Sequence, residues 1–86
     1  MPKTETAGRK LRRLRESLGL TMHDVYAASK LVAGAKRSRR FLLPPGRLSV
    51  IESGKTVPSI YRLYTLAFAY NTRMRKLLVL YGAWWR

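Results

Sequence analysis

One helix ends and the next begins within the stretch Leu18-Gly19-Leu20-Thr21-Met22-His23-Asp24-Val25. Gly19 predicts the left-handed residue that follows a helix C-terminus. Thr21 predicts an N-cap, and Asp24 three residues later completes a variant of the capping box. The leucine before Thr21 and the valine at the end of the stretch occupy the two positions of a hydrophobic staple. These independent signals predict a sharp helix boundary at Thr21.

Apolar periodicity predicts helices on both sides of this boundary. Leu11, Leu14 and Leu18 share one face of a helix that begins at Thr6. The helix after Thr21 is expected to end at about Lys30 or Ala33. Three more helices are predicted: Arg47 to Ser53 with Pro45 as a possible first residue, Ser59 to Tyr70 after the Gly54 stop, and one from a Thr72 cap through Tyr81.

The apolar positions of these later helices predict the rest of the core. They are Leu48 and Ile51 in the first, Ile60, Leu63, Tyr64, Ala67 and Tyr70 in the second, and Leu77, Leu78 and Tyr81 in the third. Sustained alternation of apolar and polar residues is absent from the sequence, so the predicted fold class is all-α.

The composition indicates one small domain with a polyanionic partner. The 86 residues contain 18 Lys plus Arg and 4 Asp plus Glu, which gives a formal net charge of +14. So much positive charge favours binding to nucleic acid or to an anionic membrane surface. Apolar residues make up 47% of the chain, enough to close a core. We expect a flexible tail at 1–5, a domain at 6–82 and an aromatic extension at 83–86.

The same inventory argues against an enzyme. The sequence contains no cysteine, one histidine (His23) and four scattered acids, and it lacks a glycine-rich phosphate loop. We therefore expect no metal, cofactor or small-molecule substrate. The longest apolar stretch, Leu77 to Trp85, is about half as long as a membrane span requires. We expect a soluble, cytoplasmic protein without a secretion signal.

A basic stretch lies between the second and third predicted helices. Residues 32–43 contain Lys36, Arg37, Arg39 and Arg40 and no acid. A solvated loop is one interpretation. Phosphate contacts are favoured, because five basic residues between 36 and 47 have no neighbouring acid. The prolines of Pro44-Pro45-Gly46 end this stretch.

Three groups of residues resemble the lambda-repressor-like, Cro/XRE helix-turn-helix family. The resemblance covers about residues 8–82. The groups are Leu11-x-x-Leu14-Arg15-x-x-x-Gly19-Leu20-Thr21, Arg47-Leu48-Ser49-x-Ile51-Glu52-x-Gly54-Lys55 and Pro58-Ser59-x-x-x-Leu63-x-x-Leu66-Ala67. No single group is specific for the family. The resemblance rests on all of them occurring in the family's order.

The resemblance implies a compact bundle of five helices that binds double-stranded DNA. The second helix would cross the phosphate backbone, and a short helix at about 45–53 would lie in the major groove. A basic and an acidic family position fall on Arg15 and Glu52, which implies an ion pair between them. The expected DNA-binding residues are Thr21, Met22, Lys36, Arg37, Arg39, Arg40, Pro45, Gly46, Arg47, Val50, Ser53 and Lys55.

The sequence departs from the family pattern in three places. The link between the second and third helices is longer than the usual tight turn. The start of the third helix, usually polar, is Pro45-Gly46, which has no side-chain donor, and the phosphate-gripping position after Thr21 is Met22. Arg47, Val50 and Ser53 remain as base readers, since arginine can pair with guanine and valine can contact a thymine methyl.

The aromatic residues are expected to serve the core or an interface. Tyr61, Tyr64, Phe68 and Tyr70 are spread around one predicted helix and are not interleaved with basic residues as in a stacking array. Trp84 and Trp85 either fold back on the bundle or, with the C-terminal helix, form a homodimer contact.

The leading functional expectation is a sequence-specific transcriptional regulator. A weakly specific binder of DNA or RNA is the first alternative, which the Pro45-Gly46 departure supports. An antitoxin-type protein-interaction module that uses the C-terminal apolar stretch is the second. A membrane-active peptide is disfavoured, because caps at Thr21 and Thr72 specify a folded bundle.

Overall fold

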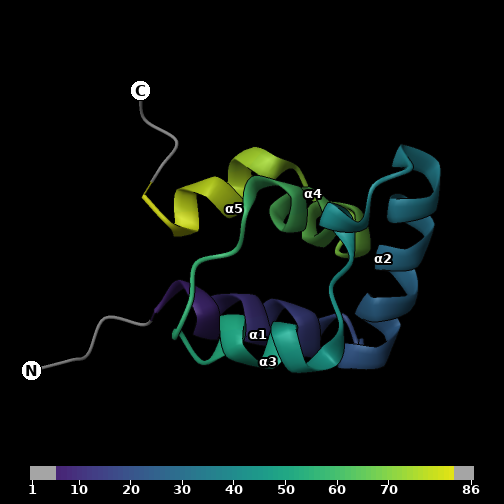
Figure 1. Ribbon diagram of the computed structural model, residues 1–86. Coiled ribbons are helices and arrows are strands. Elements are labelled where there is room, and N and C mark those ends of the chain that lie inside the picture. The colour runs from purple at the N-terminus through teal and green to yellow at the C-terminus, as the bar shows by residue number, and fades with distance from the viewer. Residues whose placement is uncertain (1–5, 83–86) are drawn as a thin grey trace, which may run out of the picture.

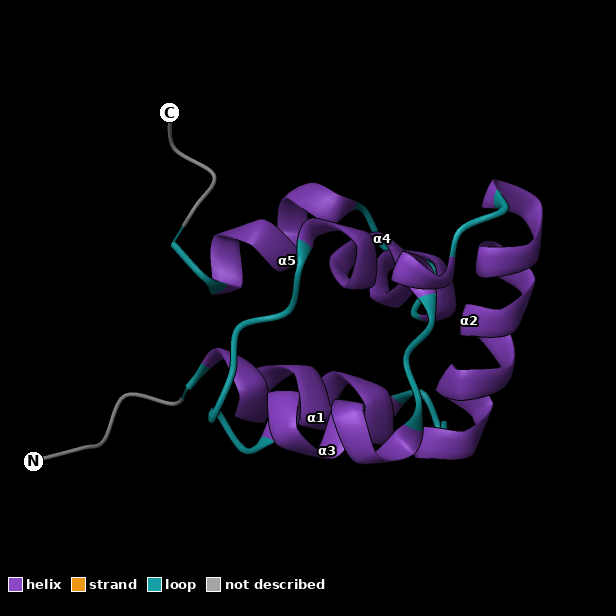
Figure 2. Ribbon diagram, in the orientation of Figure 1, coloured by secondary structure: helices purple, strands orange, loops and turns teal. Residues whose placement is uncertain are grey.

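The computed structural model describes residues 6–82, and all regular secondary structure in that range is helical (Figure 2). The expected all-α class is therefore confirmed. The elements are α1 (Ala7–Ser17), α2 (Met22–Lys36), a 3-10 turn η1 (Arg39–Phe41), α3 (Pro45–Glu52), α4 (Ile60–Ala69) and α5 (Met74–Leu80). No helix of this part of the chain is both long enough and apolar enough to cross a membrane.

The boundary between α1 and α2 has the predicted chemistry. Gly19 is left-handed, with φ 71°. The Thr21 hydroxyl accepts a hydrogen bond of 3.0 Å from the Asp24 backbone N–H, and the Asp24 carboxylate accepts one of 2.8 Å from the Thr21 N–H. Both halves of the capping box are thus formed, which fixes where α2 begins.

The predicted end of α2 is wrong. The helix continues past Lys30 and Ala33 to Lys36, and Arg37 ends it in the left-handed conformation with φ 52°. The added turn contains Gly34, a weak helix former, but Ala35 and Lys36 favour helix and the first proline comes only at Pro44. The first part of the expected insertion, residues 32–36, is therefore helix.

The later helices follow the prediction more closely. Pro45 is the first residue of α3, and Ser59 caps α4 by accepting a hydrogen bond of 3.2 Å from the Arg62 N–H. Left-handed Asn71 follows α4 with φ 51°. The expected Thr72 cap is wrong: α5 begins after Arg73, whose side chain makes no capping hydrogen bond.

The helices form two layers joined by α2. Helices α1 and α3 lie side by side, α4 and α5 lie in the opposite layer, and α2 stands across one end of both (Figure 1). The Cα radius of gyration is 12.4 Å, as expected for a compact domain of this size. The core between the layers contains Leu11, Val25, Leu43, Leu48, Ile51, Leu63, Leu66, Ala67, Tyr70 and Leu77.

Three residues predicted to face the core are exposed instead. The exposed fractions are 47% for Leu18, 53% for Ile60 and 40% for Tyr64. Leu18 is the C-cap of α1 and Ile60 is the first residue of α4, so both lie at helix ends. In α4 the core positions are taken by Leu66 and Thr65, which rotates Tyr64 toward the surface.

Candidate nucleic-acid interface

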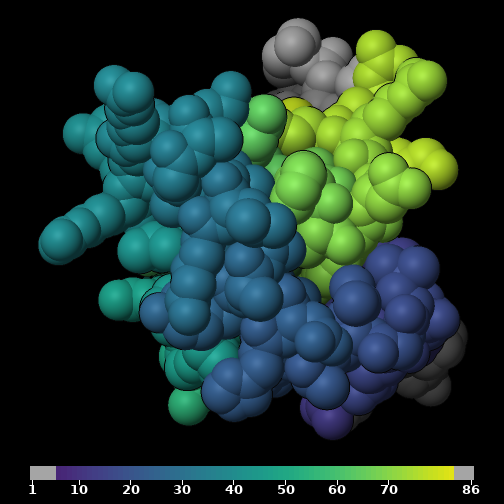
Figure 3. Space-filling view, turned by 90° about the vertical axis from the view of Figure 1, so that its right-hand side faces the viewer, coloured from purple at the N-terminus to yellow at the C-terminus, as the bar shows by residue number. Residues whose placement is uncertain are grey.

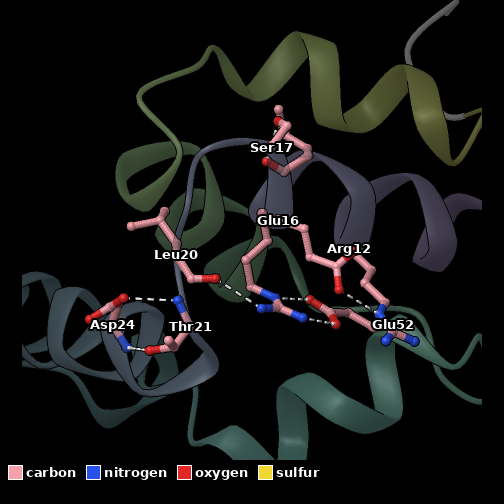
Figure 4. Close-up of polar contacts among 9 residues, drawn as sticks. Arg12, Glu16, Ser17, Leu20, Thr21, Asp24 and Glu52 are labelled. Carbon is pink, nitrogen blue, oxygen red and sulfur yellow. Dashed lines mark hydrogen bonds and ion pairs between the residues drawn. The ribbon is translucent and has the colours of Figure 1, made fainter.

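A buried ion pair between Arg15 and Glu52 joins α1 to the end of α3, as the resemblance implied (Figure 4). The Arg15 guanidinium donates hydrogen bonds of 2.8 Å and 3.1 Å to the two carboxylate oxygens. The side chains are 9% and 3% exposed. The bidentate contact raises the pKa of Arg15 above its usual range. The pair sets α3 in a fixed position against α1.

The same guanidinium also fixes the turn that precedes α2. Its Nη1 donates a hydrogen bond of 2.9 Å to the Leu20 carbonyl oxygen, one residue before the Thr21 cap (Figure 4). Arg15, a residue of α1, therefore contacts both the α1–α2 turn and α3. This arrangement holds the start of α2 and the whole of α3 in one rigid unit.

One face of α3 is open to solvent. Leu48 and Ile51 are buried, so the residues between and around them point outward. The exposed residues of the helix and its C-cap are Gly46, Arg47, Ser49, Val50 and Ser53. All the expected base readers lie on this face. The Ser53 hydroxyl donates a hydrogen bond of 2.7 Å to the Val50 carbonyl oxygen of the same helix.

Two expected site residues at the start of α2 are committed to the fold. The Thr21 hydroxyl serves the capping box, and Met22 is half-buried against the core. Neither side chain is therefore a long polar group that is free to contact a ligand. Lys55, in contrast, is exposed in the loop that follows α3.

The basic insertion packs its aromatic residue onto α4. The edge of Phe41 meets the ring of Tyr61 at a centroid distance of 5.3 Å and the ring of Tyr64 at 5.6 Å. The Thr65 hydroxyl donates a hydrogen bond of 2.6 Å to the Phe41 carbonyl oxygen. This segment therefore packs onto α4 through Phe41, while its four basic side chains are exposed.

Basic side chains cover the rings of this aromatic cluster. Arg40 donates a hydrogen bond of 2.9 Å to the Tyr61 hydroxyl, and its guanidinium carbon lies 5.2 Å from the ring centroid. The Lys36 ammonium lies 5.1 Å from the centroid of Tyr64. The expectation that these tyrosines are not interleaved with basic residues is wrong, because the interleaving comes from a distant part of the sequence.

Arg62 is a candidate site residue that the sequence did not reveal. Its Nε donates a hydrogen bond of 3.1 Å to the Leu42 carbonyl oxygen, between η1 and α3. Burial, and then the positive charge of Arg47, lower the pKa of Arg62. Arg62 thus contacts the segment between η1 and α3, and the charge of Arg47 acts on it. Only the fold of the insertion brings these residues together, so no local sequence signal could have shown it.

Each acid in residues 6–82 is engaged by a neighbouring group. Glu16 pairs with Arg12 at 3.2 Å, Asp24 caps α2 and Glu52 holds Arg15. The exposed cations around α3 and the insertion are Lys36, Arg37, Arg39, Arg40, Arg47 and Lys55. Long side chains of the segment after α2, in teal, project from one edge of the molecule in Figure 3.

An apolar groove runs between α2 and α4 and includes Lys36 in its lining. Leu31, Ala35 and Phe68 line it together with the Lys36 stem, at the seam where blue α2 meets green α4 (Figure 3). Leu31 is 68% exposed and Phe68 is 53% exposed. Of the four aromatics of α4 expected in the core or an interface, only Tyr70 is fully buried.

The expected roles of Trp84 and Trp85, and those of the tail at 1–5, lie outside the described residues. Within residues 6–82, no group of three or more His, Cys, Asp or Glu side chains is placed to hold a metal ion. Comparison of the chain with family models, with curated proteins and with solved structures found no match.

Proposed function

We propose that this protein is a sequence-specific DNA-binding transcriptional regulator of the helix-turn-helix type. The observation that carries the proposal is the open face of α3, which the buried Arg15–Glu52 pair holds in place. Exposed cations border this face, and every acid within residues 6–82 already has a partner. A helix of this size fits the major groove. A rigid mounting matters because base readout depends on the placement of a few side chains.

In this proposal Arg47 and Val50 read bases. Arg47 is exposed and lies in the first turn of α3, and arginine binds guanine through two hydrogen bonds. Val50 is 38% exposed, one turn further along the same face, and can contact a thymine methyl group. The proposed readout thus combines one strong polar contact with one apolar contact.

The surrounding cations would supply sequence-independent affinity. Lysine and arginine contacts to phosphates release counterions, which makes binding strongly dependent on salt. The net charge of +14 favours binding of the whole protein to a polyanion such as DNA. Phosphate contacts position the protein, and the α3 face would provide the sequence preference.

A weakly specific nucleic-acid binder is the second candidate, and a particular observation favours it. The N-terminal turn of α3 contains Pro45 and Gly46, which have no side-chain donor, and the Ser53 hydroxyl proton is bonded within the helix. Arg47 is then the one strong side-chain donor on the α3 face. Such a sparse reading surface would support only a slight base preference.

Selection of bound sequences from a random pool of duplex DNA separates the two candidates. If the protein is a regulator, the selected duplexes should share a motif of several base pairs. Random DNA should then compete for binding far less well than the selected site. Binding of selected and random duplexes with equal affinity at fixed salt would replace the regulator with the weakly specific binder.

A further inference from the structure

We propose that Arg40, Arg62 and Lys36 form a second phosphate-binding site, which holds the DNA backbone beside the groove occupied by α3. The ligand class is the phosphodiester backbone of duplex DNA. The inference rests on the proposed function, because it assumes that DNA is bound. The new element is that the basic insertion forms a preorganised contact surface. The aromatic cluster of Phe41, Tyr61 and Tyr64 positions its cations.

The first support is the fixed position of the cations. An exposed arginine or lysine usually samples many rotamers, and ordering it on binding costs conformational entropy. Here the Tyr61 hydroxyl and ring hold Arg40, and the Tyr64 ring lies under the Lys36 ammonium. Phe41 contacts both rings edge-on and fixes their spacing. Part of the ordering cost is thus met before DNA arrives.

The second support is the donor capacity that remains. A guanidinium carries five N–H donors. The Tyr61 contact involves only Nη1 of Arg40, and the Leu42 contact involves only Nε of Arg62. Each arginine keeps terminal N–H groups with which it can bind a phosphate oxygen, a contact that arginine makes in bidentate form.

The third support is the absence of neutralising charge among the described residues near this site. The acids Glu16, Asp24 and Glu52 are engaged on α1, at the start of α2 and at the end of α3. Arg62, in contrast, experiences the positive charge of Arg47. Adjacent cations without an acid repel each other, and a bound phosphate relieves that repulsion.

The position of the cluster fits a contact beside the groove. Residues 42–44 lead from η1, which packs on α2 and α4, across to the first residue of α3 (Figure 1). The hydrogen bond from Arg62 to the Leu42 carbonyl oxygen joins the cluster to the segment that leads into α3. A helix in the major groove is flanked by both phosphate backbones, and the cluster would meet one of them.

The test compares two double variants that remove the same charge. Lys36→Ala/Arg40→Ala alters the cluster, and Arg73→Ala/Lys76→Ala alters exposed cations of α5. Binding to one random-sequence duplex is measured over a range of salt. We expect the cluster variant to reduce the slope of log K against log salt by about 1.8, or 0.9 for each lost phosphate contact. The control should change it little.

A third variant tests the positioning role of the aromatic cluster. Tyr61→Phe keeps the ring and every charge but removes the hydroxyl that holds Arg40. We expect weaker binding of all duplexes by a common factor, with an unchanged salt slope and an unchanged melting temperature. Equal salt slopes for the two double variants would overturn the proposed site, and wild-type affinity in Tyr61→Phe would overturn the positioning role.

Failure of this site is distinguishable from failure of the regulator. The salt slopes are measured on random DNA and need no preferred sequence. Selection from a random pool, in contrast, tests sequence preference and does not depend on Lys36 or Arg40. A slope change without any selected motif would therefore support the second phosphate site while removing the regulator.

Discussion

Gly8 packs directly against Glu52: a Cβ atom at residue 8 would lie 2.7 Å from the Glu52 carbonyl oxygen and closer still to that of Ile51. This contact brings the start of α1 onto the last turn of α3. Because backbone atoms block the space, Gly8→Ala must push the two helices apart. We expect the free energy of unfolding to fall by about 1–3 kcal/mol, measured by urea denaturation.

The matched control for this change is Gly34→Ala. Gly34 lies inside α2, and a Cβ atom there meets no atom within 4 Å. Alanine is the better helix former, so this variant should gain up to about 1 kcal/mol. Equal stability of the two variants would mean that α1 and α3 are not in close contact at Gly8.

Glu52→Ala should be among the most damaging single changes. It leaves the Arg15 guanidinium buried without its carboxylate partner, which costs about 3–5 kcal/mol when a buried pair is broken. Glu16→Ala is the control, since its pair with Arg12 is more than half exposed and should contribute less than about 1 kcal/mol. Thermal melting compares the two, and similar melting temperatures would show that the Arg15–Glu52 pair is solvated.

Arg47→Ala should relax sequence preference at one base pair. If Arg47 binds a guanine, the variant loses roughly 1–3 kcal/mol of discrimination at that position and keeps most of its affinity for random DNA. Competition assays with single-base variants of the selected site, at fixed salt, measure this. A uniform loss on cognate and random DNA would instead make Arg47 a phosphate contact.

Folding stability should decrease in strongly alkaline solution because of Tyr70. Burial, and then the negative charge of Glu52, raise the pKa of the Tyr70 hydroxyl in the folded state. The contribution of Tyr70 to the free energy of unfolding is therefore complete below the pKa of about 10 that tyrosine has in the unfolded chain. It is lost as the pH rises above that value. Each such tyrosine lowers the free energy of unfolding by about 1.4 kcal/mol per pH unit in that window.

The measurement for this prediction is urea unfolding of wild type and Tyr70→Phe from about pH 9 to about pH 11. Removing the titrating group should make the alkaline decrease less steep. Burial also raises the pKa of Tyr81, so part of the decrease should persist in the variant. Identical pH profiles would show that Tyr70 ionises as freely in the folded protein as in the unfolded chain.

The sequence predicted the boundary between α1 and α2, where several local signals coincide at Gly19 and Thr21. Thr21 caps a helix and Gly19 adopts a left-handed φ regardless of distant contacts. It failed at the end of α2, where the helix continues through Gly34 to Lys36 because no proline precedes Pro44, and the left-handed Arg37 gives no sign in the sequence. It also failed at Thr72, because the start of α5 depends on packing against α4 rather than on a cap.

Local sequence signals did not reveal the long-range contacts of the candidate site, and only the resemblance indicated one of them. The family pattern pointed to the Arg15–Glu52 pair and to the exposed face of α3. The contacts of Arg62 with Leu42 and of Arg40 with Tyr61 join segments about 20 residues apart through a link that the family lacks. Gly8 was missed because a glycine near a helix start gives no sign of what approaches it.

The pairing of Glu16, Asp24 and Glu52 with neighbouring groups of the protein has a kinetic consequence. A surface whose cations are not offset attracts a polyanion over distances of about a Debye length, roughly 8 Å at physiological ionic strength. Encounter with any stretch of DNA should then be close to diffusion-limited, followed by sliding along the duplex. The rate of finding a site would be set by travel along the DNA, and the lifetime on it by the few contacts of α3.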